Sequence, residues 1–140
     1  AIYAEALNFP AVAGIVIGTR PDTVDAAILD YLKDLSQQHY IKLEYGLESI
    51  YDATLQRVNR GHSFQDAVNA IHLTAEKGLP VGIHLIFGLP GETPEMMLHA
   101  ASVISALPIT SVKFHQLQIF KHTAMATEFL QHPDFSGGFE

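Results

Sequence analysis

The feature that most constrains the fold is a regular alternation of strand-like and helix-like stretches along the chain. Short stretches rich in β-branched and other apolar residues predict strands at residues 14–18, 41–47, 81–87 and 109–119. Between them, apolar residues recur at helical spacing. Strand–helix–strand repeats with short connections predict a parallel sheet with crossover helices. The sequence therefore predicts an α/β fold.

The number of these units limits the architecture. Four strands are too few to close an eight-stranded barrel. We therefore expect a partial (β/α) barrel that lacks its first strands, with the parallel sheet inside and the helices outside. All 140 residues would belong to this barrel portion. Residues 127–140 contain Pro133, Gly137 and Gly138 and are expected to form a loop-like tail.

Capping residues predict where the helices begin and end. Asp22 is expected to cap the helix after the first strand, and a short helical turn is expected near residues 52–57. Ser63 is placed to cap the next helix, Gly78 to end it, and Thr93 to cap the one after. The expected core-facing positions of the first of these helices are Val24, Ile28, Tyr31, Leu32 and Leu35.

Composition excludes several kinds of site within this chain. It has no cysteine, so it can hold neither a disulfide nor a cysteine-ligated cluster by itself. Its formal net charge of -7 argues against a broad phosphate-binding surface. The histidines show no metal-ligand spacing, so we expect no metal ligand in this chain. The chain has no apolar run long enough to predict a membrane span. We expect a cytoplasmic location.

Strand parity predicts which side chains meet. On the second strand, Glu44, Gly46 and Glu48 alternate with apolar residues and share one face. On the third strand, His84 occupies the face opposite the apolar residues. Ligands of parallel α/β folds bind at the carboxyl ends of the strands. We therefore expect Glu44, Glu48 and His84 to converge on one cavity, with Lys113 and His115 of the last strand facing the same way.

Four strings of residues resemble the motifs of radical S-adenosylmethionine (SAM) enzymes, in the same order and spacing. The chain is most similar to the YhcC-like radical SAM family, and it also resembles the Elongator catalytic subunit and oxygen-independent coproporphyrinogen III oxidase. The resemblance runs from about residue 14 to about residue 126. The strings are Gly18-Thr19-Arg20-Pro21-Asp22, Leu43-Glu44-Tyr45-Gly46-Leu47-Glu48-Ser49, Asn59-Arg60-Gly61-His62 and His84-Leu85-Ile86-Phe87-Gly88-Leu89-Pro90-Gly91-Glu92.

The resemblance implies roles for three residues in binding SAM, and Gly88 and Arg20 are two further candidates. Glu48 and His84 match the residues that reach the ribose, and Arg60 matches the arginine that contacts the carboxylate. The turn at Gly88 would shape the adenine pocket through its backbone, and Arg20 would contact SAM or substrate. The chemistry suits these roles, since a carboxylate accepts hydroxyl donors and a guanidinium grips a carboxylate through two hydrogen bonds.

Two departures from the family pattern matter. Gly18 stands where many relatives have a carboxylate that contacts the SAM amine, and the three-cysteine motif for the [4Fe–4S] cluster is absent. In relatives that motif lies upstream, so we expect this chain to be the C-terminal part of the barrel and to be inactive alone. The complete protein would cleave SAM reductively to a 5′-deoxyadenosyl radical that attacks an unidentified substrate. By analogy, that substrate could be transfer RNA or a tetrapyrrole.

Simpler structural interpretations stay open for each residue. Glu48 could interact with a helix N-terminus, Arg60 with a surface acid, and His84 with a neighbour in the core. Arg20 could bind Asp22 and hold its own loop together, and Gly88 could serve the turn alone. A cluster-free barrel that binds a small molecule or protein without catalysis is the alternative function. We also expect dimerisation through the uncovered edge of the first strand.

Overall fold

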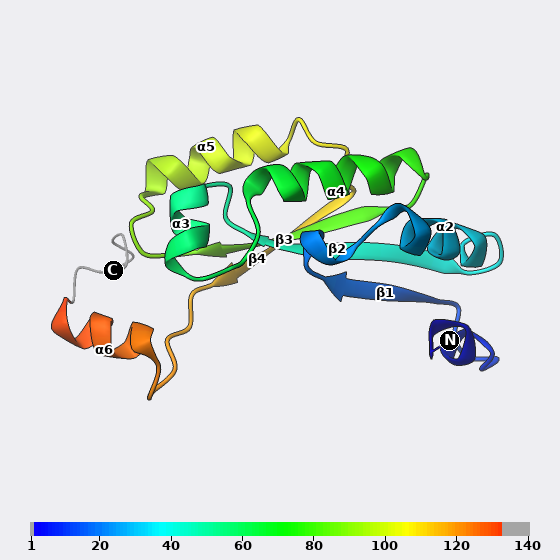
Figure 1. The fold of residues 1–140 in the computed structure, drawn as a ribbon, viewed down its shortest axis with the longest axis horizontal. Coiled ribbons are helices and arrows are strands. Elements are labelled where there is room, and N and C mark those ends of the chain that lie inside the picture. Colours follow the sequence, from blue (N-terminus) through cyan, green and yellow to red (C-terminus); the bar gives the residue numbers. More distant parts are fainter. Residues whose placement is uncertain (1, 133–140) are drawn as a thin grey trace.

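The computed structural model describes residues 2–132 and contains one parallel sheet. The strands β1 (Gly14–Thr19), β2 (Tyr40–Glu48), β3 (Val81–Phe87) and β4 (Ser111–Gln116) lie in the order in which they occur in the chain. Every neighbouring pair is parallel. The α/β fold, with parallel strands and crossover helices, is therefore confirmed (Figure 1).

Helices follow each of the first three strands and cover one face of the sheet (Figure 1). The helices are α1 (Ile2–Leu7), α2 (Ala26–Leu35), α3 (Asp52–Arg57), α4 (Phe64–Glu76), α5 (Pro94–Ile104) and α6 (Ala124–Gln131), with a 3-10 turn, η1, at Pro21–Thr23. Of these, α2, α4 and α5 supply most of the helical residues of the core, and α1 adds Leu7. The opposite face of the sheet is left open by the residues that the structure describes.

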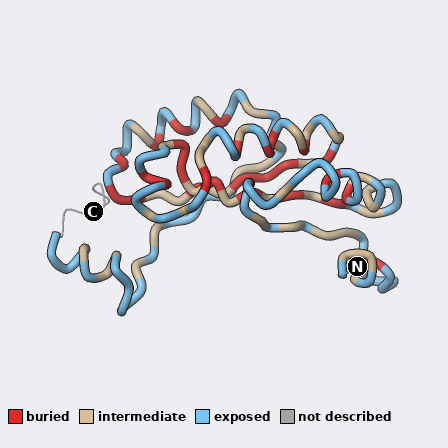
Figure 2. Tube along the Cα trace, viewed as in Figure 1, coloured by how far each residue is buried: buried red, intermediate tan, exposed pale blue. Residues whose placement is uncertain are grey.

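The buried residues show why the sheet has two unlike faces. Ile41, Leu43, Tyr45 and Leu47 alternate along β2 and are almost fully buried under the helices, whereas the residues between them are only partly buried. Burial follows the helix-covered side of the sheet (Figure 2). This alternation agrees with the parity expected from the sequence and directs the polar positions of β2 to the open face.

The first helix of the layer starts later than predicted. Asp25, not Asp22, caps α2, and its carboxylate accepts a hydrogen bond from the Ile28 backbone N–H at 2.8 Å. The prediction of Asp22 was wrong because residues 21–23 form the 3-10 turn, and the Asp22 carboxylate binds Arg20 instead. The residues of α2 that face the core also differ from those expected. Leu29 and Leu32 are buried, whereas the expected core positions Ile28 and Tyr31 are exposed.

The other helix boundaries agree with the sequence. Ser63 caps α4 in a capping box with Asp66, and Gly78 follows the helix with φ +72°, a value that favours glycine. Thr93 caps α5, which starts at Pro94. The expected loop from residue 127 is helical as far as Gln131, because Thr123 caps α6 by accepting from the Ala126 N–H. The remainder of that predicted tail, from residue 133, lies outside the described residues.

Candidate functional site

The candidate site lies on the open face of the sheet, where β2 ends. A register shift between Gly46 and Glu48 interrupts the pairing of β2 with β3, and Glu48 has φ +69°. Such a left-handed conformation costs a non-glycine residue on the order of 1–2 kcal/mol. The bulge breaks the simple alternation on which the parity argument relied. Even so, the Glu48 carboxylate reaches the expected face, because its Oε1 would lie only 2.6 Å from a Cβ added to Gly46.

Arg60 comes from the α3–α4 loop and joins Glu48. Its Nη2 lies 3.1 Å from Glu48 Oε1 and donates to the Gly46 carbonyl oxygen at 3.0 Å. The loop can turn here because Asn59 and Gly61, on either side of Arg60, both have positive φ. The two charged side chains are 17% and 26% exposed. The sequence motifs thus bring Glu48 and Arg60 together, and both keep some access to solvent.

Arg60 also has unused hydrogen-bonding capacity. Its Nε is buried, and no acceptor is found for it among residues 2–132. A guanidinium has five N–H donors, and an ionised carboxylate accepts about four hydrogen bonds. The Arg60–Glu48 pair therefore leaves both side chains able to bind a ligand that offers an acceptor group and hydroxyl donors.

His84 lies beside this pair but is bonded to another carboxylate. In the β2–β3 register His84 is opposite Gly46, the residue over which Arg60 and Glu48 lie. His84 Nε2 is 2.9 Å from Glu44 Oε2. Because an ionised carboxylate only accepts, Nε2 carries the proton in this contact, which leaves Nδ1 as an acceptor in the neutral ring.

Glu44 is the centre of a charged network that the sequence did not predict as a whole. Lys42 Nζ approaches Glu44 Oε1 at 2.9 Å, and Lys113 Nζ approaches Oε2 at 3.2 Å. Hydrogen bonds from Lys42, His84 and Lys113 lower the pKa of Glu44 to about 2, although burial opposes the shift. The two-residue spacing of Lys42 and Glu44 indicates that they share one face of the strand. Their contacts with Ser111 and Lys113 on β4 depend on the strand register, which the sequence does not predict.

Arg20 holds its own loop together. Its Nε and Nη2 donate to the two carboxylate oxygens of Asp22 at 2.9 and 2.5 Å, and Nη2 also approaches the Gly61 carbonyl oxygen at 3.4 Å. The hydrogen bonds from the Arg20 guanidinium lower the pKa of the Asp22 carboxyl. The simpler interpretation of Arg20 therefore accounts for its position. The contact with Gly61 places it beside the loop that carries Arg60.

Gly88 begins the turn after β3 and has φ +84°. A Cβ added there would lie 3.7 Å from the Leu117 Cβ, which is an ordinary van der Waals distance. The glycine is therefore required by its backbone conformation rather than by lack of space. The same turn is fixed to the end of β2, because the buried Ser49 hydroxyl donates to the buried Glu92 carboxylate. This buried link between the two motifs was not predicted from the sequence.

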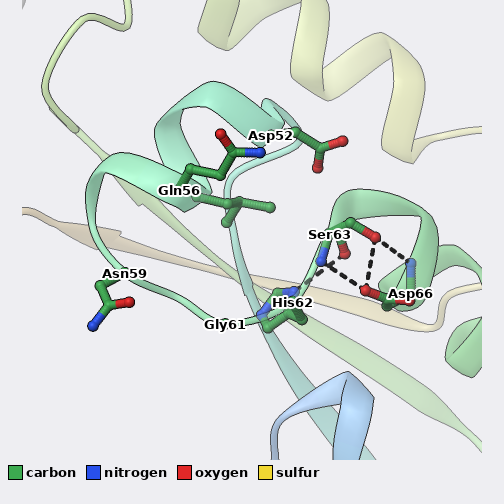
Figure 3. A pocket seen from close by; sticks show the side chains of 8 residues that line it. Asp52, Gln56, Asn59, Gly61, His62, Ser63 and Asp66 are labelled. Carbon is green, nitrogen blue, oxygen red and sulfur yellow. Dashed lines mark hydrogen bonds between the residues drawn. The ribbon is translucent and has the colours of Figure 1, made fainter.

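A separate cavity of about 450 Å³ lies at the start of α4 (Figure 3). The residues that line it are Asp52, Leu55, Gln56, Asn59, Gly61, His62, Ser63 and Asp66. None is among the five residues predicted to bind SAM, and its carboxylates are occupied by capping contacts with the backbone at Ser63 and Phe64. His62 is 8% exposed and packs against this helix start, with Nδ1 3.2 Å from the Ser63 carbonyl oxygen.

Residues 2–132 offer neither a ready-made metal site nor a membrane-spanning helix. Within this range, no three His, Asp or Glu side chains are grouped so that they could hold a metal ion. None of its helices is both long enough and apolar enough to cross a bilayer.

The chain is similar to proteins of a known family. The model of the Radical SAM superfamily matches residues 2–104. Protein YhcC of Escherichia coli strain K12 is 38% identical over 126 residues, which are 89% of this chain and 41% of that protein. The chain thus spans about two fifths of the length of this curated relative.

Solved structures agree with the fold. The archaeal Elp3 of Methanocaldococcus infernus, with an N-terminal deletion, superposes with a TM-score of 0.75 at 28% identity, covering 88% of this chain and 29% of that one. The coproporphyrinogen III oxidase HemN of Escherichia coli superposes with a TM-score of 0.71 at 20% identity, covering 89% of this chain and 28% of that one. At this lower identity, the likeness to HemN supports the fold alone.

Proposed function

Because the chain belongs to the radical SAM superfamily, we propose that the open face of its sheet binds SAM. The observation that supports this most strongly is the Arg60–Glu48 pair, held over Gly46 at the end of β2. Arg60 would bind the carboxylate of SAM, and Glu48 would accept hydrogen bonds from the ribose hydroxyls. Both groups have capacity left for this, including the unpartnered Nε of Arg60.

His84 would complete the ribose site. Glu44 fixes its Nε2 as a donor, so that Nδ1 can accept a hydrogen bond from a hydroxyl group. The turn at Gly88 would bound the adenine pocket through its backbone, and Arg20 would keep the loop of Arg60 in place through Gly61. In this proposal the residues bind and orient the cofactor and do not act as acids or bases.

The iron–sulfur cluster does not fit the residues of this chain, which has no cysteine to ligate it. We propose that cysteines outside the chain hold a [4Fe–4S] cluster in the complete protein, and that the chain alone is inactive. With the cluster in place, reductive cleavage of SAM supplies a 5′-deoxyadenosyl radical for hydrogen abstraction. Within this account the chain positions SAM and limits the access of water to it.

The substrate is a matter of analogy alone. Similar barrels act on different molecules, so fold does not identify the substrate. Transfer RNA is suggested by the resemblance of the sequence motifs to the Elongator catalytic subunit, and a tetrapyrrole by their resemblance to oxygen-independent coproporphyrinogen III oxidase. A cytoplasmic location, expected from the sequence, belongs to the same set of proposals.

Formation of 5′-deoxyadenosine tests this function. The complete protein would be reconstituted anaerobically with iron and sulfide, reduced with dithionite and mixed with SAM. We expect iron incorporation and release of 5′-deoxyadenosine, with none in a preparation stripped of iron. A protein that binds no iron and leaves SAM intact would instead support the alternative, a barrel that binds a small molecule or partner without catalysis.

A further inference from the structure

Among the residues that the structure describes, the ion pairs on the open face of the sheet join three cations, Lys42, Arg60 and Lys113, to two carboxylates, Glu44 and Glu48. Two ion pairs on this face are each neutral overall. Lys42 Nζ lies 2.9 Å from Glu44 Oε1, and Arg60 Nη2 lies 3.1 Å from Glu48 Oε1. Lys113 is a third cation and shares Glu44 with Lys42, at 3.2 Å. This excess of positive charge occurs in a chain whose formal net charge is -7, so general composition does not account for it.

Lys113 is also the most accessible member of the cluster. Its side chain is 53% exposed, compared with 13% for Lys42 and 14% for Glu44. In the register of β3 and β4, Lys113 lies opposite His84, and His115 lies opposite Ile86 on the same face. An ammonium group has three donors, and the one contact with Glu44 leaves others directed away from it.

His115 adds a second potential donor next to Lys113. Its ring centroid is 5.2 Å from that of His84, and the residue is exposed. Because residues two apart on a strand point to the same side, Lys113 and His115 present their polar ends together. The site thus lies next to the residues proposed to bind the ribose of SAM.

The contacts of Glu44 do not require Lys113. Lys42 already balances the carboxylate from a largely buried position and is itself fixed by the Ser111 hydroxyl at 2.7 Å, while His84 satisfies the second oxygen. A half-exposed ion pair contributes roughly 0–1 kcal/mol to stability. A cation with little structural role, beside an imidazole on an open face, is suited to binding an anionic ligand.

We propose that Lys113 and His115 form a subsite for an oxyanion of the substrate, a phosphate or a carboxylate group. This proposal rests on the proposed function, since it assigns the neighbouring part of the same face to SAM. The substrate would thus be an anionic molecule whose charged group is held by β4, while β2 and β3 hold the cofactor.

Equilibrium dialysis of radiolabelled inorganic phosphate against the full-length protein tests the subsite. Sodium chloride would keep the ionic strength constant, because salt screens exposed charges. We expect saturable binding that falls by about tenfold or more in Lys113→Gln, which loses one charged hydrogen bond. Lys113→Arg should retain most of it, and His115→Asn should weaken it.

Lys77→Gln is the matched control, because Lys77 pairs with Asp30 on the helical layer and its loss changes the net charge equally. Its phosphate affinity should equal that of the wild type. Competition by unlabelled acetate separates the two oxyanions: displacement indicates a site that accepts carboxylates, and its absence indicates a phosphate site. Either result supports the subsite.

Several outcomes would overturn the proposal. These are absence of saturable phosphate binding to the wild type, equal binding by Lys113→Gln, or an equal loss in Lys77→Gln. SAM affinity measured in the same variants keeps the two proposals separate. Lys113→Gln should bind SAM normally, so a protein that binds phosphate through Lys113 but shows no affinity for SAM would refute the proposed function and not the subsite.

Discussion

The guanidinium of Arg60 lies over the backbone of Gly46, with Nη2 3.0 Å from the Gly46 carbonyl oxygen. The same nitrogen is 3.1 Å from Glu48 Oε1, so the two charged side chains meet above a residue that has no side chain of its own. A Cβ on Gly46 would lie 2.5 Å from Arg60 Nη2 and 2.6 Å from Glu48 Oε1. The glycine of the motif is therefore a steric requirement of the ion pair.

Gly46→Ala should consequently impair SAM binding while preserving the fold. The added methyl group displaces the ends of two flexible side chains and meets no backbone atom among its nearest contacts. We expect SAM affinity to fall by about tenfold or more, equivalent to the loss of one charged hydrogen bond. Isothermal titration of SAM into the complete protein, with circular dichroism as the check on folding, measures both effects.

Ser102→Ala is the control for this substitution. Ser102 is exposed on α5, in the helical layer that covers the other face of the sheet (Figure 1). This variant should bind SAM with the affinity of the wild type. If Gly46→Ala bound SAM as tightly as Ser102→Ala, the ion pair above Gly46 would have no part in the site.

Glu44 should make the free energy of unfolding sensitive to acid. Its pKa in the folded protein is about 2, below the ordinary value of 4.5, so the unfolded state takes up a proton first as the pH falls. The stabilisation is fully present above about pH 4.5 and is lost as the pH falls towards about 2. Between about pH 6 and about pH 3, Glu44 should account for a loss on the order of 1–2 kcal/mol.

Urea unfolding at the two pH values, in the wild type and in Glu44→Gln, isolates this contribution. Because glutamine does not titrate, the variant should lose less stability between the two pH values than the wild type does. Equal losses would show that the contacts of Glu44 with Lys42, His84 and Lys113 do not lower its pKa.

A buried hydrogen bond between β2 and α4 should contribute to stability independently of the site. The Thr74 hydroxyl donates to the Ala70 carbonyl oxygen, so the Tyr45 hydroxyl, 2.7 Å away, donates to Thr74. Tyr45→Phe should lower the free energy of unfolding by about 1 kcal/mol. Tyr40→Phe, at a position that is 55% exposed, should change it by less than about 0.5 kcal/mol. Indistinguishable urea midpoints for the two variants would contradict this assignment.

The free edge of β1 should promote self-association of the chain. β1 pairs only with β2 in the described sheet, and Val16 is 54% exposed beside that edge. An uncovered edge strand is a template for pairing with a second copy, and a lysine on it opposes such pairing. Sedimentation velocity should show concentration-dependent dimers that Val16→Lys reduces. A single monomeric species across the concentration range would show that the edge does not pair.

Much of the fold could be predicted from sequence because it depends on local patterns. Alternating burial along β2 and the caps at Ser63 and Thr93 follow from short-range spacing and were correct. The start of α2 was predicted wrongly, because Arg20 binds Asp22 and leaves the cap to Asp25. An aspartate whose carboxylate is bound by another side chain is not free to cap a helix, and the partner of Asp22 could not be inferred from local spacing.

The site was less accessible to sequence reasoning, because its contacts depend on strand register. The face shared by Glu44 and Glu48 could be predicted from parity, but the bulge that turns Glu48 could not. Motif resemblance brought Glu48 and Arg60 to the same site. It did not show that they bind each other, or that Glu44 rather than Glu48 bonds to His84. Their roles towards SAM stay predictions.

Titration of SAM into the wild type and Glu48→Ala, in the complete protein reconstituted anaerobically, tests the central claim most directly. We expect Glu48→Ala to weaken SAM binding by on the order of 1–3 kcal/mol, the cost of losing a charged hydrogen-bond partner. Iron content should be unchanged, and Glu76→Ala, on the exposed side of α4, should bind SAM as the wild type does. Equal SAM affinity in the wild type and Glu48→Ala would remove Glu48 from the site, and a loss of iron would show that its role lies with the cluster instead.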